Sequence, residues 1–214
     1  MFRYISLTGF VLAFATIAWA YRSQPEEFRG MSQWWGEQIK NLRASLQAWA
    51  SRTHFKSATY RATLLLFALL ALTGFLPLLI FGQTLSGFPL MIHVTVAPLF
   101  AIGAVALALL YAQRQTYNQS EWDYLRQLTR RKLANKNIFA AGLSFWKKTT
   151  FWLLLLFAVP LLASVVLMMY PWFGTHGQHT LLQWHRYSSF VMTLVLFLHL
   201  YLITLEHYRA EQPR

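Results

Sequence analysis

Five apolar stretches, separated by polar or basic segments, organise the chain. They cover residues 4–20, 62–81, 90–112, 150–170 and 182–205. Each is close to the roughly 20 residues that a helix needs to cross a bilayer core of about 30 Å. None contains Asp or Glu, and none shows the two-residue alternation of a barrel strand. The pattern predicts an all-α integral membrane protein with a four-helix transmembrane core and one additional N-terminal transmembrane helix.

A different pattern lies between the first and second stretches. Apolar residues recur there at steps of four and three residues, while Lys40 and Arg43 fall on the opposite side, as in an amphipathic helix. Because Trp and basic residues suit the headgroup layer, we expect an interfacial helix lying flat on the cytoplasmic face. Docking on a partner subunit is the alternative. The apolar positions are Trp35, Ile39, Leu42, Leu46 and Trp49.

The segment between the third and fourth stretches contains two further local signals. In "SEWDYLRQL", Ser120 is a candidate N-cap with acidic residues after it, which predicts a short helix. The later "FWKKTTFW" combines aromatic residues and lysines, which is typical of the headgroup level. We therefore expect it to lead the chain from the membrane surface into the fourth spanning helix.

The charge distribution predicts the orientation in the membrane. The chain is 56% hydrophobic and 12% charged with a net charge of +12, but its basic residues cluster in 21–60 and 113–149. The connections "GQTLSGFP" and "PWFGTHGQHT" contain none. The positive-inside rule then places both basic segments and the C-terminus in the cytoplasm, with the N-terminus outside, in the cell inner membrane. Contact with membrane lipid explains the positive charge better than nucleic acid, because the basic residues form no single stripe.

The N-terminal stretch allows two interpretations. A basic start, an apolar run and Ala18-Trp19-Ala20 resemble a cleavable signal peptide. Cleavage would conflict with the charge pattern, so we favour a retained membrane helix. The predicted organisation is an N-terminal helix at 1–21, a cytoplasmic connection at 22–57, a four-helix core at 58–208 and a tail at 209–214.

Two histidines stand inside the fifth apolar stretch. His185 and His199 are fourteen residues apart. At about 100° and 1.5 Å per residue they share one helix face and lie about 21 Å apart along it. This is the geometry of a helix that gives one axial ligand to each of two haems stacked across a membrane. Two histidines hydrogen-bonded to neighbouring helices are the alternative. The absence of Cys excludes covalent c-type haem and cysteine-ligated iron–sulfur clusters.

A third histidine can complete one of these sites. His93 lies a few residues into the third stretch from its outer end, which is the expected level of His185. We therefore predict that His93 and His185 form an outer haem pair. Arg186 could meet a haem propionate, or it could be an ordinary interfacial arginine. Small residues beyond His93 would allow a macrocycle or another helix to approach: Ala97, Ala101, Gly103 and Ala104.

Three segments resemble the b-type cytochrome subunit of formate dehydrogenases and nickel-iron hydrogenases. They are "LMIHVTVAPLFAI", "KKTTFWLLLLFAVPLLA" and "LLQWHRYSSFVMTLVLFLHLYL". The resemblance covers residues 55–208 and implies two b haems and electron transfer between a partner subunit and quinone. It also implies that His93 and His185 hold the outer haem iron, and that His199 is one axial ligand of the inner haem iron.

The chain departs from this family at the fourth ligand. The family has a histidine fourteen residues before the glycine of a Ser/Thr-Gly pair. Here the pair is Thr73-Gly74, and the corresponding position is Tyr60.

Several outcomes follow for the inner haem. It could be absent, which would leave one haem. His199 could pair with His54 or with another ligand, or a displaced haem could use His54 with His207, which lies about 12 Å beyond His199. A Tyr60 phenolate is a further option.

The remaining polar candidates are weaker. The resemblance places a quinone pocket near the inner haem, where Asn137 and Gly142 are the available residues. His176 and His179 lie in the outer connection, where exposed residues or partner contacts are expected and a metal site is the alternative.

The histidines and the resemblance together predict an electron-transfer subunit of a respiratory oxidoreductase that is not catalytic alone. A haem-free membrane anchor or assembly subunit is the rival.

Overall fold

The computed structural model describes residues 1–23, 32–33, 36–37, 52–129 and 136–211. Within these residues every regular element is helical, and five helices are long and apolar enough to cross a membrane. The predicted all-α membrane fold is therefore confirmed. The apolar positions of the predicted amphipathic helix, from Trp35 to Trp49, lie outside the described residues.

The helices extend beyond the apolar stretches that predicted them. Helix α6 begins well before residue 150, and α7 begins before residue 182, because hydropathy reports membrane thickness and not helix ends. In chain order the elements are α1 (Phe2–Ser23), α3 (Arg52–Leu76), the π-helical turn η1 (Pro77–Phe81), α4 (Gly87–Tyr111), the 3₁₀ turn η2 (Ala112–Gln115), α5 (Gln119–Thr129), α6 (Lys136–Met168), the 3₁₀ turn η3 (Pro171–Phe173) and α7 (Gly174–Glu211).

The early start of α7 corrects the prediction that His176 and His179 lie in a loop. Gly174 has a φ of 59°, a left-handed value that lets the chain turn from η3 directly into the helix. The Thr180 hydroxyl donates to the His176 carbonyl, and the His179 and Gln183 side chains meet at 3.4 Å. Both histidines therefore lie on the first turns of α7.

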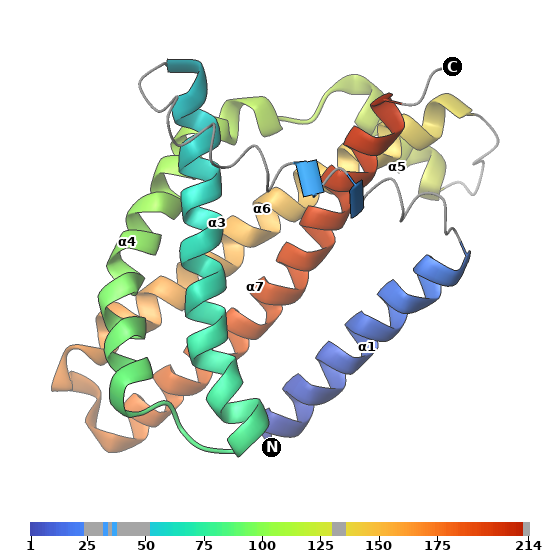
Figure 1. Ribbon diagram of the computed structural model, residues 1–214. Helices are drawn as coiled ribbons and strands as arrows, with labels where there is room; N and C mark the ends of the chain where they lie inside the picture. The colour runs from blue at the N-terminus through green and yellow to red at the C-terminus, as the bar shows by residue number, and fades with distance from the viewer. Residues whose placement is uncertain (24–31, 34–35, 38–51, 130–135, 212–214) are drawn as a thin grey trace.

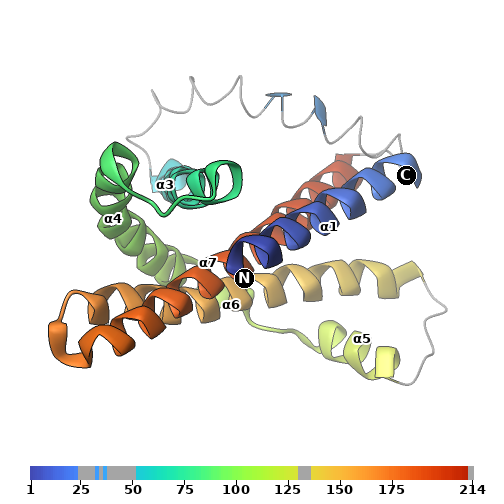
Figure 2. The same ribbon diagram turned by 90° about the horizontal axis from the view of Figure 1, so that it is seen from below.

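The core consists of two antiparallel helix pairs, α3 with α4 and α6 with α7 (Figures 1 and 2). Their common centre is apolar and includes Phe67, Phe100, Leu161 and Met192. The connections at 82–86 and 169–173 lie at one end, with the N-terminus, while α5 and the last turns of α7 lie at the other (Figure 1). We call these the short-connection end and the α5 end.

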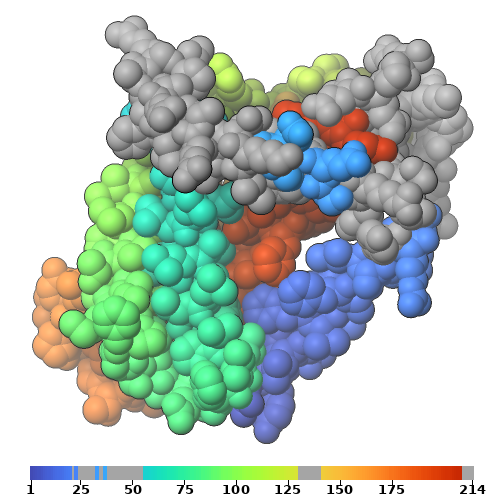
Figure 3. Space-filling view, viewed as in Figure 1, coloured from blue at the N-terminus to red at the C-terminus, as the bar shows by residue number. Residues whose placement is uncertain are grey.

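Helix α1 packs on the outside of this core. Phe10 meets Phe75 and Phe190 edge-on, with ring centroids 5.4 Å apart in both pairs. Gly9 faces the Phe190 ring so closely that a Cβ there would overlap it. In the first turn of α1, Arg3 donates to the Leu79 carbonyl of η1 at 3.2 Å. In Figure 3, α7 is visible between α3 and α1.

The predicted short helix is present as α5, but its cap is Asn118 and not Ser120. The Asn118 side-chain oxygen accepts from the Glu121 backbone N–H at 3.0 Å, and Glu121 Oε2 accepts from the Asn118 N–H at 2.8 Å. This reciprocal pair is a capping box with Asn in the first position. Ser120 donates its hydroxyl to Asn118 at 2.8 Å and so supports the cap.

Candidate functional site

Three histidines inside the bundle share one arrangement. The Nδ1 atom of each meets a hydroxyl oxygen on the neighbouring antiparallel helix. His93 of α4 meets Thr73 of α3 at 2.9 Å. On α7, His185 meets Ser164 at 3.4 Å and His199 meets Thr150 at 2.8 Å. All three imidazoles are therefore held by the same type of interhelical contact.

The hydroxyl groups also contact carbonyls of their own helices. Thr73 donates to the Leu69 carbonyl at 2.9 Å, and Thr150 donates to the Lys147 carbonyl at 2.9 Å. Ser164 donates to its helix in the same way at 2.7 Å. A hydroxyl carries one proton, and when that proton is given to the carbonyl its oxygen can accept from an imidazole Nδ1–H. The contacts are therefore compatible with the tautomer in which Nε2 is unprotonated and has a free lone pair, the form that binds a metal ion.

The first two histidines lie side by side at the short-connection end. The ring centroids of His93 and His185 are 6.2 Å apart, with 72° between the planes. Both side chains are half-buried. Gly74 lies against the His93 ring, and a Cβ there would stand 3.4 Å from its Cε1. The predicted outer pair is therefore brought together by α4 and α7.

The same contact between a histidine and a hydroxyl occurs at two positions along the paired helices α6 and α7. Ser164 and Thr150 are fourteen residues apart on α6, as are His185 and His199 on α7. Because the two helices are antiparallel and the two spacings are equal, a single alignment places Ser164 opposite His185 and Thr150 opposite His199. His199 consequently lies about 21 Å from His185 along α7, towards the α5 end.

His199 lines a cavity of about 280 Å³. The cavity begins among core residues such as Phe100 and Met192, and it extends to polar residues at the α5 end. Tyr60 also lines it, and the Tyr60 hydroxyl is buried without a hydrogen-bond partner among the described residues. Further lining residues are Lys147, Glu206 and His207.

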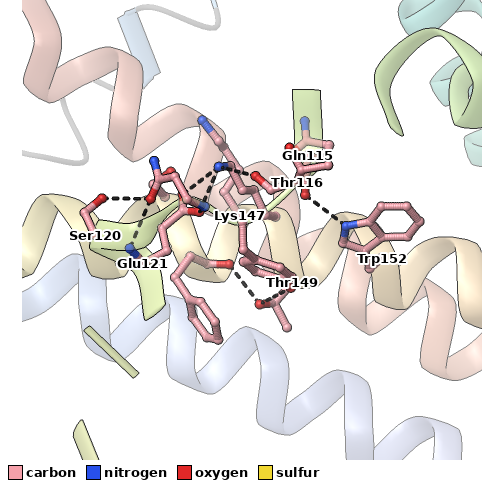
Figure 4. A network of polar contacts seen from close by, with 12 residues as sticks. Gln115, Thr116, Ser120, Glu121, Lys147, Thr149 and Trp152 are labelled. Atoms are coloured by element: carbon pink, nitrogen blue, oxygen red, sulfur yellow. Dashed lines mark hydrogen bonds and ion pairs between the residues drawn. The ribbon is translucent and has the colours of Figure 1, made fainter. Parts of the chain in front are cut away.

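A buried ion pair fixes α5 against α6 at the same end. The Lys148 ammonium lies 2.7 Å from Glu121 Oε1, and these residues are 9% and 0% exposed. Lys148 also donates to the Thr116 carbonyl at 2.8 Å, and Ser144 donates to Glu121 at 2.5 Å. Figure 4 shows the surrounding network, including the Trp152 indole that donates to the Gln115 carbonyl at 3.0 Å.

These contacts determine the ionisation of Glu121. Burial acts to raise the pKa of its carboxyl. Hydrogen bonds from Lys148, Ser144 and the Asn118 backbone, with the positive charge of Lys148, outweigh burial and hold the pKa below its usual value. Glu121 is therefore a carboxylate paired with Lys148 at neutral pH.

Lys147, which precedes Lys148 on α6, forms an ion pair with α7 and not with α5. Lys147 donates to Glu206 of α7 at 2.5 and 2.6 Å. The motif "FWKKTTFW" thus joins α6 to α5 through Lys148 and to α7 through Lys147, in addition to supplying Thr150. The sequence prediction of a headgroup segment missed both ion pairs. For Lys147 the available signal was Glu206, which directly follows the fifth apolar stretch, whereas no local pattern marks the pairing of Glu121 with Lys148.

The other predicted site residues lie on α3, α6 and α7. Arg186 is half-buried beside His185, and His54 lies in the first turn of α3 with its side chain outside the described residues. The side chain of Asn137 is also outside them. Gly142 is buried against the Tyr124 ring, where a Cβ would lie 2.7 Å from Cε2. Close packing of α6 on α5 therefore requires this glycine.

The fold and site define a multi-pass membrane protein with imidazoles in its interior. The family described as prokaryotic cytochrome b561 matches residues 62–212, which is most of the chain and includes α4, α6, α7 and the larger part of α3. The chain belongs to this family and is a membrane cytochrome that carries b-type haem in electron transfer. No curated protein and no solved structure matches it.

Proposed function

We propose that His93 and His185 are the axial ligands of a b-type haem at the short-connection end. Their ring spacing supports this assignment. Two metal–imidazole bonds of about 2.0 Å, with about 1.1 Å from each nitrogen to its ring centre, add to about 6 Å. The observed centroid separation is 6.2 Å. The Nδ1 contacts to Thr73 and Ser164 leave both Nε2 atoms for the iron.

When bound, the haem supplies a one-electron Fe(III)/Fe(II) couple. The protein supplies the ligand geometry and the surroundings. Hydroxyl acceptors at Nδ1 orient each ring and make it a more basic ligand. The apolar core excludes water, and Arg186 is available for a propionate at the same level. The arrangement would be suited to passing electrons without binding a substrate at the iron, because His93 and His185 would both be ligands of that iron.

We propose further that the chain is a subunit of a respiratory oxidoreductase that exchanges electrons between a partner subunit and quinone. The support is the family together with the resemblance of "LMIHVTVAPLFAI" and "LLQWHRYSSFVMTLVLFLHLYL" to the cytochrome subunits of formate dehydrogenases and nickel-iron hydrogenases. The orientation we propose is the short-connection end outside and the α5 end in the cytoplasm of the inner membrane. The location of the two basic segments supports it.

Haem analysis of single-site variants tests the ligand assignment. His93→Ala and His185→Ala are each expected to remove the same haem from the purified full-length protein, as measured by its b-type α band and redox potential. His199→Ala is expected to retain that haem, and His176→Ala is a matched control on the same helix as His185. Retention of the haem in both outer variants would refute the assignment. Reduction by a quinol in membranes, abolished with the haem, tests the electron-transfer route.

A further inference from the structure

Helix α1 packs on the α3–α4 pair beside the residues that hold His93. The Phe10 ring meets the Phe75 ring of α3 edge-on, with the centroids 5.4 Å apart. Phe75 directly follows Gly74, which lies against the His93 ring, and Thr73, which meets His93 Nδ1. A displacement of Phe75 would therefore move the surroundings of this imidazole.

The same part of α1 packs on the α6–α7 pair close to His185. The Phe10 ring also meets the Phe190 ring of α7 edge-on at 5.4 Å. Phe190 lies five residues after His185, which is about 7.5 Å along the helix. Gly9 allows this approach, because a Cβ at that position would overlap the Phe190 ring. One side chain of α1 is thus wedged between α3 and α7 near both histidines.

The first turn of α1 makes a second bridge of the same kind. Phe2 is buried and meets the Tyr187 ring of α7 edge-on at 5.2 Å. The Arg3 guanidinium donates to the Leu79 carbonyl of η1 at 3.2 Å. Gly82 leaves room for this guanidinium, since a Cβ there would stand 2.5 Å from Arg3 Nη1. Aromatic packing on one side and a hydrogen bond on the other therefore fix α1 to both pairs.

The bridge matters because His93 and His185 belong to different helix pairs. Contacts are much more extensive within each pair than between the pairs. The separation of the two imidazoles, 6.2 Å between ring centroids, consequently depends on how the pairs are held relative to each other. Metal–imidazole bonds of about 2.0 Å tolerate deviations of only about 0.2 Å. A small shift between the pairs would thus strain or break one of two axial bonds.

We propose that α1 sets the separation and relative orientation of His93 and His185, with Phe10 as a positioning residue for the outer haem. The proposal rests on the proposed function, since it assumes that these histidines are the axial ligands. Helix α1 precedes residues 62–212, which match the family. The role therefore belongs to a segment of this chain that the family match does not include.

Phe10→Ala in the purified full-length protein tests the proposal. We expect the affinity for the outer haem to fall about tenfold, as for other residues that support metal ligands. The electron paramagnetic resonance signal of the ferric haem should also shift, because its largest g value depends on the angle between the imidazole planes, which is 72° here. Haem titration and low-temperature spectra of the oxidised protein measure the two effects.

Phe14→Ala is the matched control. It makes the same substitution one turn later on α1, where Phe14 is 61% exposed and meets Phe197, twelve residues beyond His185. Both the affinity and the spectrum are expected to stay native in this variant. Gly9→Ala perturbs the same interface without removing a ring and is expected to act in the same direction as Phe10→Ala. Phe10→Leu keeps much of the apolar contact and should restore most of the affinity.

An unchanged outer haem in both Phe10→Ala and Gly9→Ala would overturn the proposal. Equal losses in Phe14→Ala would overturn it as well, because they would show general destabilisation of the bundle. The intact mass of the purified haem protein is expected to include residues 1–20, and a haem-binding chain without them would contradict the role of α1. Haem loss in His93→Ala and His185→Ala without any effect of the α1 variants would overturn this proposal alone. Haem retention in those two histidine variants would refute the proposed function itself.

Discussion

Removal of the Thr73 hydroxyl should change the outer haem without removing it. Valine has nearly the same shape as threonine but cannot accept from His93 Nδ1, which lies 2.9 Å from the hydroxyl oxygen. The lost acceptor makes the imidazole a weaker donor to iron. Ferric iron depends more on a basic ligand than ferrous iron does, so the midpoint potential of this haem should rise in Thr73→Val.

The hydrogen bond sets the size of the effect. A net contribution of about 0.5–1.5 kcal/mol, at 59 mV per factor of ten for one electron, corresponds to a rise of roughly 20–65 mV. The affinity of the protein for this haem should also fall, by about 10- to 100-fold. Spectroelectrochemical titration of the purified protein measures the potential, and haem content after dilution in detergent measures retention.

Two variants control for changes unrelated to the hydrogen bond. Thr95→Val makes the same substitution on α4, where the hydroxyl is exposed and donates to the Met91 carbonyl. Thr73→Ser keeps the hydroxyl and is expected to retain the native potential. An unchanged potential in Thr73→Val, or an equal rise in Thr95→Val, would refute the assigned role of the hydroxyl at His93.

The Glu121–Lys148 ion pair gives two predictions about stability. Lys148→Met leaves a buried carboxylate without its partner and is expected to lower the free energy of unfolding by about 3–5 kcal/mol; Glu121→Gln with Lys148→Met should cost less than Lys148→Met alone, and additive losses in a chemical unfolding series would contradict the pairing. Because the folded pKa of Glu121 lies below the unfolded value of 4.5, its contribution is complete above about pH 4.5 and is lost as the pH falls through the folded pKa. The stability difference between the native protein and Glu121→Gln should therefore shrink in that acid range, and a difference that grows with acidity would exclude the assigned charge state.

The sequence predicted the membrane helices because their composition alone meets the requirement of the bilayer. Helix ends were predicted less well, since the first turns of α7 from Gly174 are polar and carry no hydropathy signal. The cap of α5 was misplaced by two residues because Asn118 and Ser120 are both good caps, and the reciprocal bond to Glu121 distinguishes them.

The candidate site was predicted in part. Helical geometry placed His185 and His199 on one face, and the structure adds that both meet hydroxyls of α6. The equal spacing of Ser164 and Thr150 is visible in the sequence. Its meaning depends on the register between two helices, which is set by packing. The pairing of Lys148 with Glu121 required α5 to fold back on α6, and no local pattern encodes that contact.

The α6 segment 147–150 links three parts of the α5 end. Lys147 is paired with α7, Lys148 with α5, and Thr150 holds His199. Contacts to α5, to α7 and to His199 are therefore made within one turn of α6. The His93–His185 pair does not use this turn, because Thr73 belongs to α3 and Ser164 lies fourteen residues further along α6. A substitution at Lys147 or Lys148 is thus expected to disturb the surroundings of His199 more than those of His93 and His185.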